Sequence, residues 1–224
     1  MTAAGEDRTL SASRGSVHPR AGIRARIRGL YAIADVTVGG NPALSARAFV
    51  AGGCRVMQLR AKGWSRAEVA DAAREMLEIT RPVGALLLIN DHPDIAAEVG
   101  ADGVHVGQAD LPASEARRIL GPHGLIGVSN NTPDELDAAL PHADYVAVGP
   151  MYDTPNLSRP KPVRGLDLLR EARTRTDLPL VAIGGITVER VAAVRAAGAD
   201  SWAVIRGVCA VPDPEAAVRA FMQA

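Results

Sequence analysis

The feature that most constrains the fold of this chain is a regular alternation of short apolar runs with amphipathic segments, beginning near residue 29. Near-continuous apolar runs are typical of parallel strands that are covered on both faces. Eight such runs occur along the chain, with helical patterns between them. The predicted strands cover residues 30–35, 55–60, 85–90, 103–107, 125–129, 145–149, 180–184 and 202–206.

The segments between these runs carry helix signals. Residues 65–80 place their apolar side chains on one face, and Ser65 is the predicted N-cap. Thr132 and Pro133 predict another helix start, as cap and first helical residue. The closing helix is expected to bury an apolar stripe formed by Ala217, Val218, Phe221 and Met222.

Eight strand–helix units in roughly 195 residues match a compact (β/α)8 barrel. An open doubly wound sheet is the main alternative, but the count of eight and the lack of a strong G-x-G-x-x-G after the first run favour the barrel. We therefore predict a single (β/α)8 TIM-barrel domain over residues 29–224. Residues 1–28 carry six arginines against two acidic residues and are expected to form a basic, mobile tail. The segment "GIRARIRGL" (22–30) is open to two interpretations, a short helix or a cover for the bottom of the barrel.

Composition excludes several classes of function. Twenty-five basic residues balance twenty-five acidic ones, so no net charge favours nucleic acid or a membrane surface as partner. Two cysteines, Cys54 and Cys209, are too few for a disulfide framework and indicate reduced, cytosolic thiols. No apolar run approaches the roughly 20 residues of a membrane span, and no signal peptide is evident. We expect a cytoplasmic protein, with homo-oligomerisation left open.

Polar side chains follow nearly every predicted strand. In a barrel, the carboxyl ends of the strands meet at one rim, which is where active sites of this architecture lie. The strand ends therefore predict a single polar rim. Its members are Asp35, Gln58, Arg60, Lys62, Asn90, Asp91, His105, Gln108, Asp110, Ser129, Asn130 and Arg206.

Two carboxylates of this rim, Asp91 and Asp110, follow adjacent strands. One or two carboxylates with water and phosphate oxygens suit Mg²⁺, whereas no Cys/His cluster has the spacing that zinc requires. Each aspartate also precedes a predicted helix and could be an N-cap. Their occurrence together beside Arg60 and Lys62, which suit phosphate oxygens, favours a site for a metal and a diphosphate. The glycine pair in "AIGGIT" (182–187) indicates a second phosphate site.

These motifs resemble the thiamine-phosphate synthase family in order and spacing, over roughly residues 29 to 223. The matching stretches are "YAIAD", "MQLRAK", "LLINDHPDIA", "ADGVHVGQADLP", "LIGVSNNTPDE", "ADYVAVGP", "PLVAIGGIT" and "GAD…VIRGV". The resemblance implies a transferase that joins hydroxymethylpyrimidine diphosphate to thiazole phosphate and releases pyrophosphate. Diphosphate departure would be Mg²⁺-assisted and would leave a stabilised pyrimidine cation.

The same resemblance implies roles for individual residues. Asp91 and Asp110 would hold Mg²⁺, and Gln58 and Ser129 would contact the pyrimidine. The leaving diphosphate would bind Arg60, Lys62 and Asn90. The thiazole phosphate would bind Thr154, Asn156, Gly185 and the backbone around Ile205 and Arg206.

One stretch departs from the family. After the sixth strand the family usually reads T-x-T-K, but here the residues are Thr154-Pro155-Asn156-Leu157. Asn156 keeps a hydrogen-bond donor, whereas Leu157 cannot replace a cation. We expect Lys161 to fold back and restore the charge as a catalytic residue with Arg60, Lys62 and Ser129.

Two other functions are compatible with the same rim. One is a thiazole tautomerase-like isomerase, for which His105 is the candidate general base. Asp110 argues against it, because the tautomerase relatives lose that carboxylate. The other is a non-catalytic ligand-binding paralogue with a degenerate phosphate loop.

Overall fold

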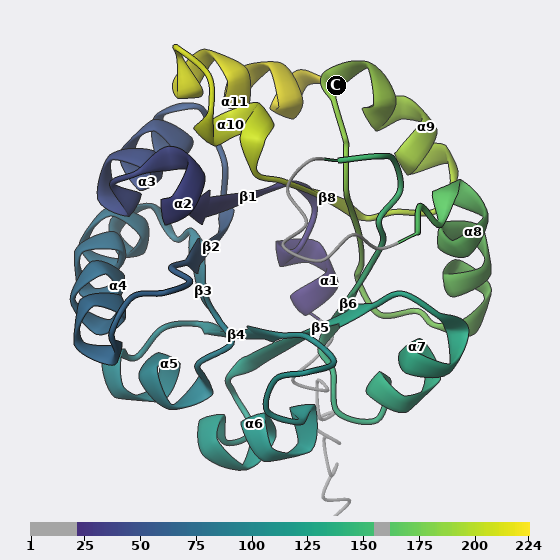
Figure 1. Ribbon diagram of the computed structural model, residues 1–224, viewed down its shortest axis with the longest axis horizontal. Helices are drawn as coiled ribbons and strands as arrows, with labels where there is room; N and C mark the ends of the chain where they lie inside the picture. The colour runs from purple at the N-terminus through teal and green to yellow at the C-terminus, as the bar shows by residue number, and fades with distance from the viewer. Residues whose placement is uncertain (1–21, 155–161) are drawn as a thin grey trace, which may run out of the picture.

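The eight predicted strands form one closed parallel barrel (Figure 1) in a computed structural model that describes residues 22–154 and 162–224. Each strand pairs with its neighbour in sequence, and β8 pairs with β1 to close the barrel. The predicted (β/α)8 architecture is confirmed, and the open-sheet alternative is excluded. The strands are β1 (Gly29–Asp35), β2 (Val56–Arg60), β3 (Leu86–Asn90), β4 (Gly103–Val106), β5 (Leu125–Asn130), β6 (Tyr145–Val148), β7 (Leu180–Ile183) and β8 (Ser201–Val204).

Helices surround the barrel, as Figure 1 shows in a view down its axis. No helix of the described residues is both long and apolar enough to cross a membrane. The helices are α1 (Ile23–Arg26), α2 (Val36–Gly39), α3 (Pro42–Ala51), α4 (Arg66–Thr80), α5 (Pro93–Val99), α6 (Ala113–Leu120), α7 (Pro133–Ala139), α8 (Gly165–Arg175), α9 (Val191–Ala196), α10 (Arg206–Cys209) and α11 (Pro214–Gln223), with short 3₁₀ turns η1 (Arg81–Val83) and η2 (Val188–Arg190).

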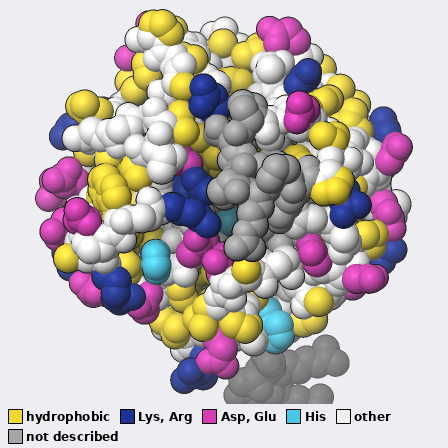
Figure 2. All heavy atoms as spheres, in the orientation of Figure 1, with side chains coloured by type: hydrophobic (Ala, Val, Ile, Leu, Met, Phe, Trp, Pro, Cys, Tyr) yellow, Lys and Arg dark blue, Asp and Glu magenta, His cyan; other side chains and the backbone are white. Residues whose placement is uncertain are grey.

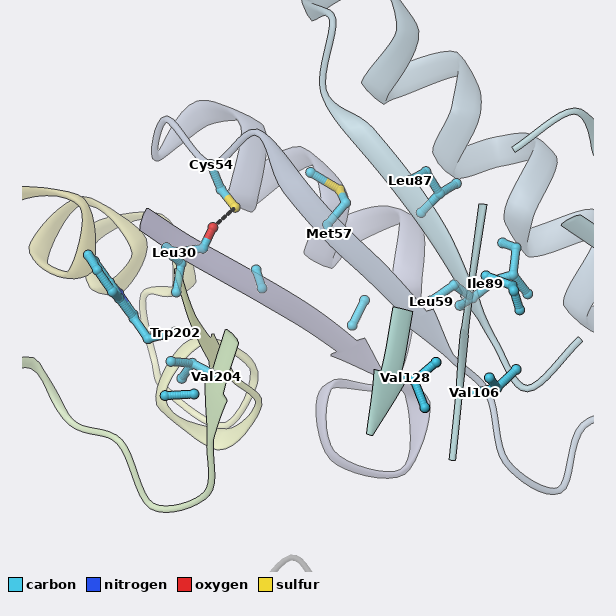
Figure 3. Packing of buried hydrophobic residues seen from close by; sticks show 14 of the residues in the cluster. Leu30, Cys54, Met57, Leu59, Leu87, Ile89, Val106, Val128, Trp202 and Val204 are labelled. Carbon is cyan, nitrogen blue, oxygen red and sulfur yellow. Dashed lines mark hydrogen bonds between the residues drawn. The ribbon is translucent and has the colours of Figure 1, made fainter. Parts of the chain in front are cut away.

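Alternate residues of each strand face opposite sides of the sheet, which divides the core into two clusters. The outer cluster lies between the strands and the helices and includes Leu30, Met57, Leu87 and Trp202 (Figure 3). The inner cluster fills the barrel itself, with Tyr31, Val56, Leu86, Leu88, Tyr145 and Val181 among its members. Because the side-chain period is two, the residues two or four positions further along these strands also point inward, at the carboxyl end of the barrel.

The segment before β1 closes the other end of the barrel. Residues 23–26 form the short helix α1, and Ile27 is fully buried as a member of the inner cluster. Both interpretations offered for this segment therefore apply. The rest of the expected tail, residues 1–21, lies outside the described residues.

Most of the predicted element ends are close to the observed ones. Ser65 caps α4 in a capping box with Glu68, and Thr132 caps α7, as predicted. The eighth strand was predicted to reach Arg206 but ends at Val204, because Ile205 has helical backbone angles and α10 begins at Arg206. The prediction that Met222 is buried was also wrong, since this residue is 43% exposed. It lies about 100° around α11 from Phe221, which faces the core.

Candidate active site

Side chains from β1 to β5 meet those of β6 to β8 at the carboxyl end of the barrel, where they line two adjoining pockets. The inner pocket has a volume of about 120 Å³ and lies within the barrel. Apolar side chains of β6 to β8 form one wall of it. Its polar lining consists of Tyr31, Gln58, Arg60, Asn90, His105 and Ser129.

The outer pocket has a volume of about 230 Å³ and lies over the ends of β5 to β8. Thr154, the turn at Gly184 and Gly185, Ile205 and Arg206 all line it, as the sequence predicted for a phosphate site. Gly185 has φ +62°, and a Cβ there would lie 2.5 Å from the Asp153 carbonyl oxygen. Only glycine fits this turn, because the segment at Tyr152 and Asp153 packs directly against its backbone.

Within the described part of the chain, one residue supplies the charge of the outer pocket. Among the described residues that line this pocket, Arg206 is the only one with a charged side chain, and it has no ion-pair partner within the described part of the chain. Arg206 was a predicted member of the polar rim, and the family resemblance implied only a backbone role for it. Asn156, Leu157 and Lys161 lie outside the described residues, so the expected return of Lys161 toward the pocket stays a prediction.

The two pockets share a boundary. Five residues line both of them: Ser129, Ala147, Ile183, Ala203 and Ile205. Ser129 is the polar member of this set and comes from the end of β5. Groups bound in the two pockets would therefore be neighbours, with Ser129 between them.

Asp91 and Asp110 lie at the same end of the barrel, near enough for the Asp110 carboxylate to raise the pKa of Asp91. Neither is a helix cap, since the N-cap positions of α5 and α6 are His92 and Pro112. Asp110 instead accepts a hydrogen bond from the Gly107 backbone N–H at 2.8 Å. The metal interpretation is therefore favoured over the capping alternative.

The backbone of Asp91 is unusual. It is the only non-glycine residue with positive φ (65°) in the part of the chain that the structure describes. Strained backbone of this kind clusters at functional sites, and Asp and Asn are the residues that tolerate it best. The turn carries the Asp91 carboxylate beyond the end of β3, toward Lys62, whose Nζ lies 3.4 Å from Oδ2.

Burial and the nearby Asp110 carboxylate raise the pKa of Asp91, and Lys62 opposes this effect. A cation between the two carboxylates would relieve their repulsion. Within the described residues no three His, Cys, Asp or Glu side chains are arranged to hold a metal. The donor set is thus two carboxylates, which fits Mg²⁺ better than zinc. Figure 2 shows acidic and basic side chains next to each other on this face.

A buried carboxylate fixes the position of the Arg60 side chain. Its guanidinium forms an ion pair with Asp35, whose side chain is 2% exposed. The Asp35 carboxylate also accepts hydrogen bonds from the Thr37 backbone N–H at 3.0 Å and hydroxyl at 2.6 Å. The register of β1 with β2 places Asp35 directly opposite Arg60. Arg60 therefore presents a fixed positive charge to the inner pocket.

A row of hydrogen bonds crosses the barrel beneath the inner pocket. The Gln58 amide donates to the Tyr31 hydroxyl at 2.8 Å, and Tyr31 contacts the Tyr145 hydroxyl at 2.9 Å. His105 joins Tyr145 through Nδ1 at 2.9 Å and Ser129 Oγ through Nε2 at 2.8 Å. Burial lowers the pKa of His105 to about 4, so its imidazole is neutral near pH 7.

This row of hydrogen bonds includes His105, the candidate general base of an isomerase. Both ring nitrogens of His105 already have side-chain partners, as expected for a hydrogen-bonded histidine of the barrel wall. Tyr31 and Tyr145 received no role from the sequence. The two-residue period of a strand could have indicated that Tyr31 points into the barrel, because Tyr31 lies on the same face of β1 as Ile33 and Asp35.

A closed parallel barrel with polar pockets at the carboxyl ends of its strands defines the class of (β/α)8-barrel enzymes. A family model described as thiamine monophosphate synthase matches residues 30–208 of this chain. The chain belongs to that family, as its motifs predicted.

Individual relatives agree with this assignment. The thiamine-phosphate synthase of Anaeromyxobacter dehalogenans is 46% identical over 205 residues, which cover 91% of this chain and 90% of that protein. The thiamine-phosphate synthase of Laribacter hongkongensis is 44% identical over 172 residues, 77% of this chain and 82% of that protein. Among solved structures, thiamine phosphate pyrophosphorylase from Pyrococcus furiosus has a TM-score of 0.82 at 31% identity, covering 90% of this chain and 96% of that one.

Proposed function

We propose that this chain condenses hydroxymethylpyrimidine diphosphate with thiazole phosphate to give thiamine phosphate and pyrophosphate. The observation that carries the proposal is the pair of adjoining pockets, which meet at Ser129. The inner pocket is lined by the anchored Arg60, with Lys62 and two carboxylates at the same end of the barrel. The outer pocket has a glycine turn and Arg206, which has no ion pair among the described residues. Two phosphorylated substrates bound there would have their reacting ends in contact.

In the inner pocket, Gln58 and Ser129 would hold the pyrimidine ring, and Arg60, Lys62 and Asn90 the diphosphate. Gln58 and Arg60 of β2 and Asn90 of the neighbouring β3 line this pocket, which supports these roles. Arg60 suits phosphate oxygens through its planar fork of donors, and Lys62 acts as a compact charge at the rim.

The residues at the mouth fit a divalent cation. Asp91 and Asp110 would hold Mg²⁺, because they are two neighbouring carboxylates and Mg²⁺ usually takes one or two from a protein. When bound, Mg²⁺ would neutralise negative charge on the diphosphate.

In the outer pocket, the thiazole phosphate would lie against the Gly185 turn, Thr154 and the start of α10. We assign the side chain of Arg206 to this phosphate in addition to the backbone around Ile205. Asn156 and Lys161 remain predicted members of the same site.

The residues around the inner pocket suit a dissociative reaction. The bond between the pyrimidine methylene carbon and the diphosphate oxygen breaks, and the electron pair leaves with the diphosphate. The electron-rich aminopyrimidine stabilises the resulting cation, and the thiazole nitrogen then donates its lone pair to form the new C–N bond. Such a reaction needs no protein nucleophile. Arg60 and Lys62 stabilise the charge that develops on the leaving group.

The cellular setting is part of the proposal. Cys54 and Cys209 are both free thiols, which supports a reducing, cytoplasmic location. Assembly into a homo-oligomer is left to measurement of the molecular mass in solution.

The test is to incubate the chain with both substrates and Mg²⁺ and to measure pyrophosphate and thiamine phosphate. We expect equal amounts of the two products, formed only when both substrates are present, and no activity in chelator until Mg²⁺ is restored. An isomerase would convert a thiazole phosphate without pyrimidine diphosphate, and a ligand-binding paralogue would form no product. Either result would overturn the proposal.

A further inference from the structure

A chain of five hydrogen-bonded side chains, which we call the buried relay, joins the two expected pyrimidine contacts beneath the inner pocket. It runs from Gln58 through Tyr31, Tyr145 and His105 to Ser129. We infer that Tyr31, Tyr145 and His105 are positioning residues that set the direction of hydrogen bonding at both ends and so make the pocket selective for one donor–acceptor pattern. This inference rests on the proposed function, because Gln58 and Ser129 are its pyrimidine contacts.

The direction of the relay follows from counting hydrogens. The Gln58 amide nitrogen can only donate, so the Tyr31 oxygen accepts from it. The Tyr31 hydrogen then has one remaining partner, the Tyr145 oxygen. Tyr145 in turn must donate to Nδ1 of His105. A neutral imidazole with Nδ1 as acceptor carries its hydrogen on Nε2, which therefore donates to Ser129 Oγ.

The opposite direction would leave a hydrogen without an acceptor. If Ser129 donated to His105, then Tyr145 would donate to Tyr31, whose oxygen would have donors on both sides. In that direction the Tyr31 hydrogen would have no acceptor among the described side chains of the relay, and both Tyr31 and Tyr145 are buried from bulk water. A buried donor without a partner is strongly disfavoured.

Packing holds the middle of the relay rigid. Gly127 of β5 faces the barrel interior, and a Cβ there would lie 1.9 Å from the Tyr145 ring. The absent side chain at Gly127 is what makes room for the Tyr145 ring. The rings of Tyr145 and His105 then lie 5.6 Å apart between centroids, inclined by 30°.

The two ends of the relay consequently offer different groups to a ligand. Ser129 accepts from His105, which leaves its own hydroxyl hydrogen to be donated into the pocket. Gln58 donates from its nitrogen to Tyr31, which leaves its carbonyl oxygen as an acceptor. The complementary ligand is a heterocycle with a ring-nitrogen acceptor and an exocyclic amino donor. A ring with an oxo group in place of the amino group would be mismatched.

The first test is the tautomer of His105, measured by long-range ¹H–¹⁵N NMR of the full chain and assigned by loss of its signals in His105→Gln. We expect the Nε2–H form in the wild type. Tyr31→Phe does not touch His105 but removes the hydroxyl that donates to the Tyr145 oxygen and so orients Tyr145. That oxygen can then accept from His105, so we expect the Nδ1–H form to appear as well. Tyr152→Phe, whose hydroxyl lies outside the relay, should leave the tautomer unchanged.

The second test is substrate selectivity in the same variants. Tyr31→Phe should raise the KM for pyrimidine diphosphate about tenfold, the effect of one lost hydrogen bond, with the KM for thiazole phosphate unchanged. It should also reduce the preference for the amino over the oxo pyrimidine diphosphate by about tenfold. Tyr152→Phe should show neither change, and Tyr145→Phe should reproduce both if Tyr31→Phe is unstable.

The inference is wrong if wild-type His105 is the Nδ1–H tautomer, or if breaking the relay changes neither the tautomer nor the selectivity. The NMR result does not depend on turnover. A chain with the expected tautomer that forms no thiamine phosphate would overturn the proposed function alone, whereas an active chain without these effects would overturn the relay alone.

Discussion

At the scale of single residues, the charges of the site differ in how firmly they are held. Arg60 is anchored to Asp35 inside the barrel mouth, and Asp35 is fixed by two hydrogen bonds from Thr37. Lys62 forms an ion pair with the rim carboxylate of Asp91 and is 50% exposed. A charge anchored in this way costs no reorganisation when negative charge develops on a leaving group. Arg60 is thus the better candidate for stabilising the departing diphosphate.

This difference predicts the effect of Asp35→Asn. The variant keeps the shape of the side chain but removes the charge that holds Arg60, so we expect the KM for pyrimidine diphosphate to rise about tenfold. The free energy of unfolding should fall by about 1–3 kcal/mol, measured by urea denaturation. Asp167→Asn is the matched control, because Asp167 forms an exposed pair with Arg170 and should change neither quantity. Wild-type kinetics in Asp35→Asn would show that Arg60 needs no anchor.

Individual site residues were predictable to different extents. The carboxylate pair was predictable because Asp91 and Asp110 follow strands β3 and β4, and only coordinates show that neither caps a helix. The roles of Tyr31 and Tyr145 were missed because a tyrosine in an apolar strand resembles ordinary core. Their hydroxyls acquire partners only when β1 and β6 face each other across the barrel.

At the scale of elements, the outer pocket is built from three turns that follow β6, β7 and β8. The Gly184–Gly185 turn lies against the segment after β6, and Arg206 begins α10 directly after β8. The eighth strand was predicted to extend to residue 206, which was wrong because the apolar residues continue beyond the last backbone hydrogen bond of β8 with its neighbours. The early start of α10 matters, since it places Arg206 at the pocket.

Arg206→Ala should raise the KM for thiazole phosphate about 10- to 100-fold, because a charge-assisted hydrogen bond to phosphate is lost. The KM for pyrimidine diphosphate should not change, and Arg206→Lys should recover part of the loss. Arg170→Ala on the exposed face of α8 is the control and should be neutral. Steady-state kinetics with each substrate varied in turn gives these values.

An unchanged KM in Arg206→Ala would mean that the phosphate charge comes from elsewhere. Lys161→Ala then decides whether the loop after β6 supplies it, as the sequence suggested. Unchanged Michaelis constants and kcat in Lys161→Ala would rule out that role.

At the scale of the whole molecule, the barrel brings together residues that are far apart in the sequence. Ser129 at the end of β5 borders the inner pocket, whose lining begins at Tyr31, and the outer pocket, which extends to Gly207. The apolar runs were sufficient to predict the strands and the closed sheet. The volumes of the two pockets and their shared wall were not predictable, because they depend on how side chains of several strands pack across the barrel.

The most direct test of the account is the rate of pyrophosphate release by Asp91→Asn at saturating Mg²⁺ and both substrates. Asn tolerates the positive φ of this position, so the variant removes the charge and leaves the backbone turn in place. Asp94→Asn, three residues further on and paired with Arg66, is the control. We predict a rate at least about 100-fold lower for Asp91→Asn and an unchanged rate for Asp94→Asn. Release at the wild-type rate by Asp91→Asn would contradict the central claim that the carboxylate pair holds the Mg²⁺ that assists departure of the diphosphate.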